Sequence, residues 1–508
     1  MTRLTRNVIY NTVGQGLVLV LSFLAVRFIF RRLGDDVFGI IFFNLVLTAV
    51  LTSALELGVL ATIVREVSGH YETDPQYVKD LVRTASVLYW AAGLLLVAVI
   101  WLTAPLLVTH WVNLKTIDPT SAATMLRILS ASSLVALPRG LYTSLFRGRQ
   151  LMAANNIIDV ATAATQQLGI LAILQAGGGM YWVAAWISIS ALLGLTAYVI
   201  VASRLFGWAA LSPAFSMAVV RRNVAFTSNT MATSVLSLIH TQSAQVIVSK
   251  LVPIATFGLY GFAASTVNRA TIVSGAVGQA ALPSLSNLHR LGDRGALLTQ
   301  YRKLQDALSY GTVPLFAGVI FAALPVYRYV FNAPSAWMLL IPTAWLCLGY
   351  YMSGTTVIPY MFSLAVGRPD ITMKAMLLAL FIVLPVTIAL IYVFGLAGAG
   401  FSWVFYHLFM YAYMIRRIAR ECLSIPPLQW YAQVGKALGT ATVIYGIAWL
   451  GLAVTTSYSL PGLVAAYAIA TLAFSAAALF FIGPDLKTTL RRLPAMRPLT
   501  KIPLSPLG

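Results

Sequence analysis

The chain has 508 residues, of which 59% are hydrophobic and only 9% charged, and its mean hydropathy is +0.84. Average soluble chains carry about 25% charged residues, and transmembrane barrels use alternating segments of about 10 residues, so this composition excludes both classes. The formal net charge of +20 points to anionic lipid headgroups rather than nucleic acid, because the Lys and Arg residues stand beside long uncharged stretches.

These uncharged stretches predict about fourteen membrane-spanning helices, since about 20 apolar residues cross the hydrocarbon as one helix. Glycine and proline clusters divide the longest stretches into pairs of helices. The first stretch is too long for a signal peptide and is expected to remain as a helix. The expected limits are 8–30, 37–60, 83–109, 121–146, 156–176, 180–202, 224–250, 254–283, 307–331, 337–365, 371–394, 396–416, 437–456 and 460–483.

The Lys and Arg residues lie mostly on one side of these expected spans. Cytoplasmic loops of membrane proteins carry such an excess, so we assign this side to the cytoplasm. The assignment predicts a multi-pass membrane protein with both termini in the cytoplasm.

Two sets of motifs recur along the chain at an almost constant spacing. The copies lie six expected helices apart, and an even number preserves orientation, so the two halves are parallel repeats. We therefore expect an all-α polytopic membrane protein with two six-helix lobes, 1–215 and 216–422, around a central cleft. Two peripheral helices and a basic tail, 423–508, follow them. The motif pairs are Arg6-Asn7-Val8 with Arg222-Asn223-Val224, and Arg32-Leu33 then Phe38-Gly39 with Lys250-Leu251 then Phe257-Gly258.

Catalytic signatures are missing from the sequence. The loops are short, and there is no phosphate-binding loop, no spacing typical of metal ligands and no nucleophile–base pair. The two cysteines, Cys347 and Cys422, fall in different kinds of segment and are not expected to pair. We therefore expect no enzyme activity and no cofactor.

Polar side chains recur every three or four residues along several expected helices, which puts them on one helix face. Such a face within a membrane needs a neighbouring helix or water beside it. Hydrogen bonding between helices and a shared hydrated cavity both stay open, although stripes on the first and seventh helices, which are repeat partners, favour the cavity. The cavity-lining candidates are Asn11, Gln15, Asn44, Thr48, Thr52, Gln166, Asn229, Thr233 and Ser237.

Charged residues within spans cost roughly 2.5–3.5 kcal/mol each and therefore indicate function. Arg139 and Arg269 lie inside expected helices, and Arg127 lies nearer a helix end, where it can also snorkel. Because only Glu56 and Asp159 are acids clearly within spans, an anion should complete the site, and guanidinium groups suit a diphosphate. Alternatively, the two acids neutralise arginines in fixed pairs. Candidates for proton or ion coupling are Glu56, Asp159 and His240.

Four short motifs lie at the ends of expected helices: Arg32-Leu33-Gly34 with Phe38-Gly39, Glu56-Leu57-Gly58 followed by Arg65, Phe257-Gly258-Leu259-Tyr260 followed by Ala263, and Pro283 to Ser286. Together they resemble signatures of the MOP (multidrug/oligosaccharidyl-lipid/polysaccharide) superfamily, in its polysaccharide transporter branch, which includes the Wzx O-antigen flippases. The resemblance implies two six-helix lobes with alternating access. It also implies flipping of undecaprenyl-diphosphate-linked oligosaccharide from the cytoplasmic to the outer leaflet of a bacterial cytoplasmic (inner) membrane, for surface polysaccharide assembly.

The resemblance supplies no binding residues, so Arg139, Arg269 and Arg127 depend on the charge argument. We expect them to hold the diphosphate, the polar cavity to hold the sugar, and the prenyl chain to stay in lipid between the lobes. The expected partners are this lipid-linked oligosaccharide, anionic lipids and a polysaccharide polymerase or export machinery. A lipid II flippase, a cation-coupled drug antiporter and, less favoured, a membrane glycosyltransferase are the alternatives.

Overall fold

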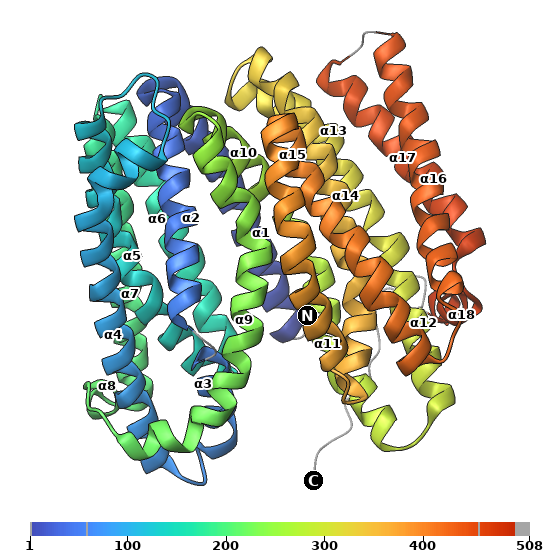
Figure 1. Ribbon diagram of the computed structural model, residues 1–508, viewed down its shortest axis with the longest axis horizontal. Helices are drawn as coiled ribbons and strands as arrows, with labels where there is room; N and C mark the ends of the chain where they lie inside the picture. Colours follow the sequence, from blue (N-terminus) through green and yellow to red (C-terminus); the bar gives the residue numbers. More distant parts are fainter. Residues whose placement is uncertain (1–2, 57–58, 456–457, 493–508) are drawn as a thin grey trace. The chain divides into compact units, whose positions relative to one another are not determined.

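The computed structural model describes residues 3–56, 59–455 and 458–492 (Figure 1), and these are helical apart from short connections. The all-α prediction is confirmed. Ten helices in this described part are long and apolar enough to cross a membrane. The count is lower than fourteen partly because one helix, α15, joins the expected span 371–394 to most of the next, 396–416, through a kink at Gly395.

The elements follow each other in chain order with short connections. The first part comprises α1 (Arg3–Leu33), α2 (Asp35–Glu56), α3 (Val59–His70), α4 (Pro75–Leu106), η1 (Leu107–Trp111), α5 (Pro119–Gly148), α6 (Met152–Gln175), α7 (Met180–Phe206) and α8 (Trp208–Leu211). Next come α9 (Met217–Leu251), α10 (Ile254–Arg269), α11 (Ile272–Arg290), α12 (Arg294–Gly311), α13 (Val313–Val330) and α14 (Ala333–Ala365). The last are α15 (Asp370–Met410), η2 (Tyr411–Ile415), η3 (Ile418–Leu423), α16 (Pro427–Val454), α17 (Leu460–Phe481) and α18 (Pro484–Arg492).

Helix starts are marked in the sequence by acidic caps, several of them followed by proline. Asp74 accepts the Tyr77 backbone N–H at 3.1 Å before Pro75, and Asp118 accepts the Ser121 N–H at 2.8 Å before Pro119. The cap satisfies an amide that has no partner inside the helix, and proline at the first position has no N–H to satisfy. Caps of this kind let α4 begin eight residues before the apolar stretch that predicted it.

The chain divides into two compact units. The first consists of Met1–Ser265, Val326–Pro342 and Met376–Ser402, and the second of Thr266–Pro325, Thr343–Ala375 and Trp403–Gly508. The repeat-based lobes, 1–215 and 216–422, have other limits and stay a prediction.

In the first unit, α5 packs against α2, α3, α4 and α7. Its buried side chains Leu141, Leu145 and Phe146 meet Tyr198 of α7 and residues of α3 and α4 in one apolar core.

The two copies of the repeat motif meet within the first unit. A Cβ atom added to Gly258 of α10 would lie 2.8 Å from the Cα of Gly39 of α2, and one added to Gly39 would lie 2.2 Å from the carbonyl oxygen of Ile254. Small residues allow helix backbones to approach this closely. The rings of Phe42 and Phe262 flank the crossing, with centroids 6.4 Å apart. The repeated Phe-Gly motif therefore forms a helix contact between the two repeats.

Candidate functional site

Arg139 forms the centre of a polar cluster between α5, α6 and α7. One of its terminal nitrogens lies 2.6 Å from Asp159 Oδ1, and the buried Tyr198 hydroxyl donates to the same oxygen at 2.7 Å. Arg139 therefore has a carboxylate partner. This agrees with the alternative given by the sequence, in which the acids within spans neutralise arginines in fixed pairs. The side chain of Arg139 remains 48% exposed and that of Asp159 40% exposed. A diphosphate-binding role for Arg139 stays a prediction.

The two other candidate arginines have different surroundings. Arg127 donates from Nε to the carbonyl of Trp101 on α4 at 3.0 Å, and its guanidinium lies over that indole ring. Arg269 is exposed at the last residue of α10, and no carboxylate of the described residues lies within ion-pair distance of it. Arg139 belongs to the first unit and Arg269 to the second, so a shared site for the two also stays a prediction.

The expected helix 254–283 is broken next to Arg269. The chain leaves α10 there, turns through Ala270 and Thr271, and starts α11 at Ile272. The amides of Ala270 and Thr271 donate to the carbonyls of Val267 and Asn268, each at 3.0 Å, so the turn satisfies its own backbone. The prediction of one continuous helix here is wrong, and Arg269 lies at the end of α10, three residues before the start of α11.

The polar stripes show several kinds of local environment. Asn44 is buried with its Oδ1 unpartnered, whereas the Thr52 hydroxyl donates to the Thr48 carbonyl at 2.7 Å. Gln166 is half-buried and Ser237 is exposed. Nε2 of the buried His240 lies 2.8 Å from the Met376 carbonyl oxygen. Leu57-Gly58 of one motif lies outside the described residues. The same holds for the side chains of five further candidates: Asn11, Gln15, Glu56, Asn229 and Thr233.

Three acids that the sequence analysis did not select are almost fully buried: Asp36, Glu66 and Asp306. Asp36 lies at the start of α2, Glu66 in the second half of α3 and Asp306 within α12, and hydrogen-bond donors gather around each carboxylate. All three lie outside the expected spans, so the expectation that Glu56 and Asp159 are the acids clearly within spans stays a prediction.

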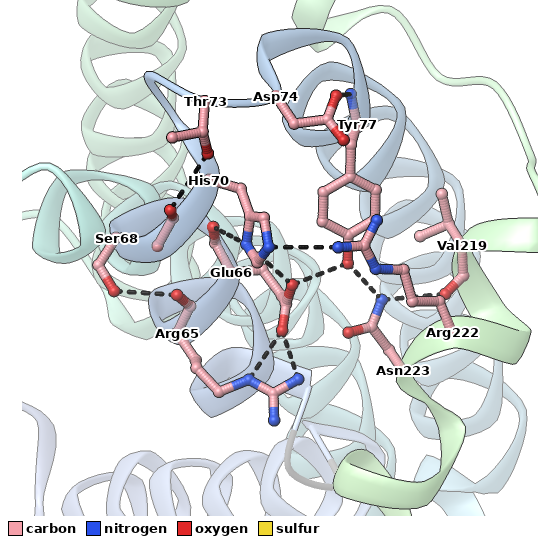
Figure 2. A network of polar contacts seen from close by, with 11 residues as sticks. Arg65, Glu66, Ser68, His70, Thr73, Asp74, Tyr77, Val219, Arg222 and Asn223 are labelled. Carbon is pink, nitrogen blue, oxygen red and sulfur yellow. Dashed lines mark hydrogen bonds and ion pairs between the residues drawn. The ribbon is translucent and has the colours of Figure 1, made fainter.

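Glu66 is the centre of a network that joins α3, α4 and α9 (Figure 2). Its carboxylate accepts from Arg65 Nε at 2.7 Å and from the Tyr77 hydroxyl at 3.0 Å, and the Asn223 amide donates to that hydroxyl at 2.9 Å. Arg222 donates to His70 Nε2 at 3.2 Å, so the His70 proton belongs on Nδ1, which faces Glu66. The repeat motif Arg222-Asn223 thus anchors the start of α9.

The second unit contains an apolar groove of ≈ 710 Å³ between α13, α14 and α16. Phe316 and Phe321 of α13, Cys347 of α14, and Tyr445 and Trp449 of α16 form parts of its walls. This volume lies within the usual range of about 300–1,000 Å³ for ligand pockets. Because its lining is almost entirely apolar, the groove suits a hydrocarbon chain and offers little to a sugar or a phosphate.

These features define a helical membrane protein with the fold of MOP-superfamily transporters. The solved structure of the lipid II flippase MurJ in an inward closed conformation matches with a TM-score of 0.69 at 13% identity, covering 92% of this chain and 98% of that one. An inward-facing multidrug resistance MATE family transporter matches with a TM-score of 0.63 at 12% identity, covering 83% and 95%. A MOP superfamily transporter from Pyrococcus furiosus matches with a TM-score of 0.56 at 11% identity, covering 86% and 95%.

The chain belongs to the polysaccharide biosynthesis protein family, whose model matches residues 4–289. No curated protein matches it in sequence. Family and fold together confirm the predicted superfamily and a multi-pass membrane protein, and they are those of transporters and flippases rather than of enzymes.

Proposed function

We propose that this protein is a flippase for undecaprenyl-diphosphate-linked oligosaccharide. It carries the substrate from the cytoplasmic to the outer leaflet of a bacterial inner membrane, for surface polysaccharide assembly. The family membership supports a substrate from polysaccharide biosynthesis. The excess of Lys and Arg residues on one side supports cytoplasmic termini.

The apolar groove is the observation that carries the proposal. A carrier of a lipid-linked sugar must hold a polar head and a hydrocarbon chain at the same time. The groove between α13, α14 and α16 in the second unit provides an apolar surface for the hydrocarbon chain of the substrate. We therefore assign the prenyl chain to this groove, which replaces the earlier expectation that it stays in lipid between the lobes.

The diphosphate needs cationic donors, and Arg139 and Arg269 supply them in the proposal. Arg139 uses one terminal nitrogen for Asp159, and a guanidinium has five N–H donors, so donors remain for a phosphate oxygen. Arg269 adds a charge at the α10–α11 break. Outward movement of the anion is favoured by the membrane potential, by about 2.3 kcal/mol per charge per 100 mV.

Alternating access, with the two repeats moving relative to each other, is the transport mode we assign. The polar stripes would then line the path of the sugar. Glu56, Asp159 and His240 remain the candidates for proton or ion coupling, and a polysaccharide polymerase or export machinery remains the partner that would receive the product.

Two glycines of α16 allow a matched test. Gly446 lines the groove and Gly439 does not, and a Cβ atom at either would meet nothing within 4 Å. Gly446→Phe should fill the groove and abolish surface glycan export in cells that depend on this protein. Gly439→Phe makes the same chemical change on the same helix and should leave export intact. Equal export by both variants, at equal expression, would remove the groove from the mechanism.

A lipid II flippase is the second candidate, favoured by the similarity to the MurJ fold over nearly the whole chain. Its substrate carries the same diphosphate and prenyl groups, so the groove and the arginines serve either function. Complementation of a peptidoglycan-flippase mutant, compared with complementation of a glycan-export mutant, distinguishes the two.

A further inference from the structure

Asp306 is a buried carboxylate of α12 that binds two segments much later in the chain. It is 3% exposed, and it accepts hydrogen bonds from Gln433 Nε2 of α16 and from the Gly483 backbone N–H, the latter at 2.8 Å. No Lys or Arg of the described residues lies within ion-pair distance of it. A buried carboxylate depends on such donors, because water is no longer there to solvate it.

The fit at Gly483 is close. A Cβ atom there would lie 2.9 Å from Asp306 Oδ2, so glycine lets the backbone approach the carboxylate. Gly483 also directly precedes α18, and the positive end of a helix favours a nearby anion. Since Gln433 lies near the start of α16 and Gly483 follows α17, Asp306 holds both open ends of the α16–α17 hairpin.

The same hairpin forms one wall of the apolar groove. The lining residues of α16 run from Leu438 to Leu450, directly after Gln433. At the far end of the groove, Trp449 meets Phe321 of α13 edge-to-face at 5.3 Å. Between these two attachments the lining includes the small residues Ala441 and Gly446. The Tyr467 hydroxyl of α17 also donates to the Pro314 carbonyl of α13 at 3.0 Å. The Asp306 contacts therefore hold the start of α16 in place, while Tyr467 and Trp449 attach the rest of the hairpin to α13.

We infer that Asp306 is a positioning residue for the groove: through Gln433 and Gly483 it sets the width of the slot that receives the prenyl chain. The identity of this occupant rests on the proposed function, whereas the effect of Asp306 on the groove does not. A change at Asp306 should release the start of α16, so that this end of the helix moves away from α13 while Tyr467 and Trp449 keep the rest of the hairpin attached. The hairpin itself persists, because α16 and α17 pack along each other.

Two substitutions separate hydrogen bonding from charge. Asp306→Asn keeps an acceptor for the Gly483 N–H, and the Gln433 amide can turn its oxygen toward the new NH₂ group. Asp306→Ala removes both contacts. The matched control is Asp293→Ala, which removes a carboxylate that caps the same helix through the Ala296 N–H at 2.9 Å and has no contact with the hairpin.

The first measurement is the width of the groove in the full-length protein. Nitroxide labels are attached to cysteines introduced at the exposed residues Leu315 of α13 and Lys436 of α16, and pulsed electron spin resonance measures the distance between the labels. Both native cysteines are buried, so the labels should react with the introduced ones. Asp306→Ala should lengthen and broaden the distance distribution, while Asp306→Asn and Asp293→Ala keep the native one. A native distribution in Asp306→Ala, or an equal change in Asp306→Asn, would overturn the inference.

The second measurement uses a photoreactive undecaprenyl phosphate as probe. Asp306→Ala should lower cross-linking to α16 by about tenfold or more, because it removes two buried hydrogen bonds. Asp306→Asn should restore it. If the wild-type protein does not cross-link although the distances respond as expected, the proposed occupant is wrong and the positioning role stands. Unchanged cross-linking in Asp306→Ala would refute the link between Asp306 and chain binding.

Discussion

The crossing of α2 and α10 allows a quantitative test of how the two repeats pack. Gly39→Ala would bring a methyl group 2.2 Å from the Ile254 carbonyl oxygen, and Gly258→Ala would bring one 2.8 Å from the Gly39 Cα. Non-bonded carbon atoms prefer about 3.5–4.0 Å. Each substitution therefore forces the two helices apart by roughly 1 Å, and Gly39→Ala demands the larger shift.

The expected cost follows from two opposing effects. Overpacking costs about 1–3 kcal/mol. Replacing a helical glycine by alanine returns about 1 kcal/mol through helix propensity. The net destabilisation should therefore be roughly 0–2 kcal/mol, and it should be larger for Gly39→Ala. The control is Gly275→Ala in α11, where a Cβ atom meets nothing within 4 Å, so only the gain of about 1 kcal/mol is expected.

Equilibrium unfolding in mixed detergent micelles measures these differences, and the double variant sharpens the test. Once one methyl group has separated the helices, the second should cost less, giving a coupling free energy of about 0.5–3 kcal/mol between the two sites. Two outcomes would refute the close crossing. One is a Gly39→Ala variant as stable as the Gly275→Ala control, and the other is strictly additive effects of Gly39→Ala and Gly258→Ala.

Three further predictions concern acids near helix ends. Asp36→Ala removes the acceptor of three backbone N–H groups and should destabilise the protein by at least about 2 kcal/mol, read as a lower unfolding midpoint. Glu66→Gln should cost about 1–3 kcal/mol because it weakens the Tyr77 contact within a buried network, whereas the exposed Glu72→Gln should cost almost nothing in the same assay. Hydrogen bonds from the Thr120 hydroxyl and from Ser121 lower the pKa of the Asp118 carboxyl to about 2. Its stabilising effect is therefore complete above its unfolded pKa, near 4, and most of it is lost as the pH falls to about 2; a wild-type advantage over Asp118→Ala that is as large at pH 2 as at pH 7 would contradict this.

Helix positions could be predicted from the sequence because apolar length is a local property. The expected span 180–202 and the helix Met180–Phe206 agree closely, and Gly177 to Gly179 mark the turn before it. The break after Arg269 was missed because the segment 254–283 is apolar overall, and apolar length does not reveal where backbone hydrogen bonding stops. The helix α3 was missed because it is amphipathic rather than uniformly apolar.

The polar sites were harder to predict because their partners are distant in the sequence. Glu66 depends on Tyr77 and, through it, on Asn223 of another helix, and Asp306 depends on Gln433 and Gly483. No periodicity within one helix contains these pairings. The Phe-Gly repeat was a long-range signal in the sequence, and it marked the two glycines that meet between α2 and α10.

The Arg139–Asp159 pair also bears on how an empty carrier returns across the membrane field. An unpaired guanidinium would be costly inside the bilayer and would have to move against a potential that drew the anionic substrate outward. With Asp159 at 2.6 Å, the charge of Arg139 is largely balanced in the empty carrier, and the Tyr198 hydroxyl holds the carboxylate in place. A diphosphate that binds at Arg139 then adds negative charge to a balanced pair rather than cancelling a lone positive charge. Under the proposed function, Asp159→Asn should therefore tighten binding of the diphosphate head while slowing repeated transport, and faster export by this variant would contradict that role.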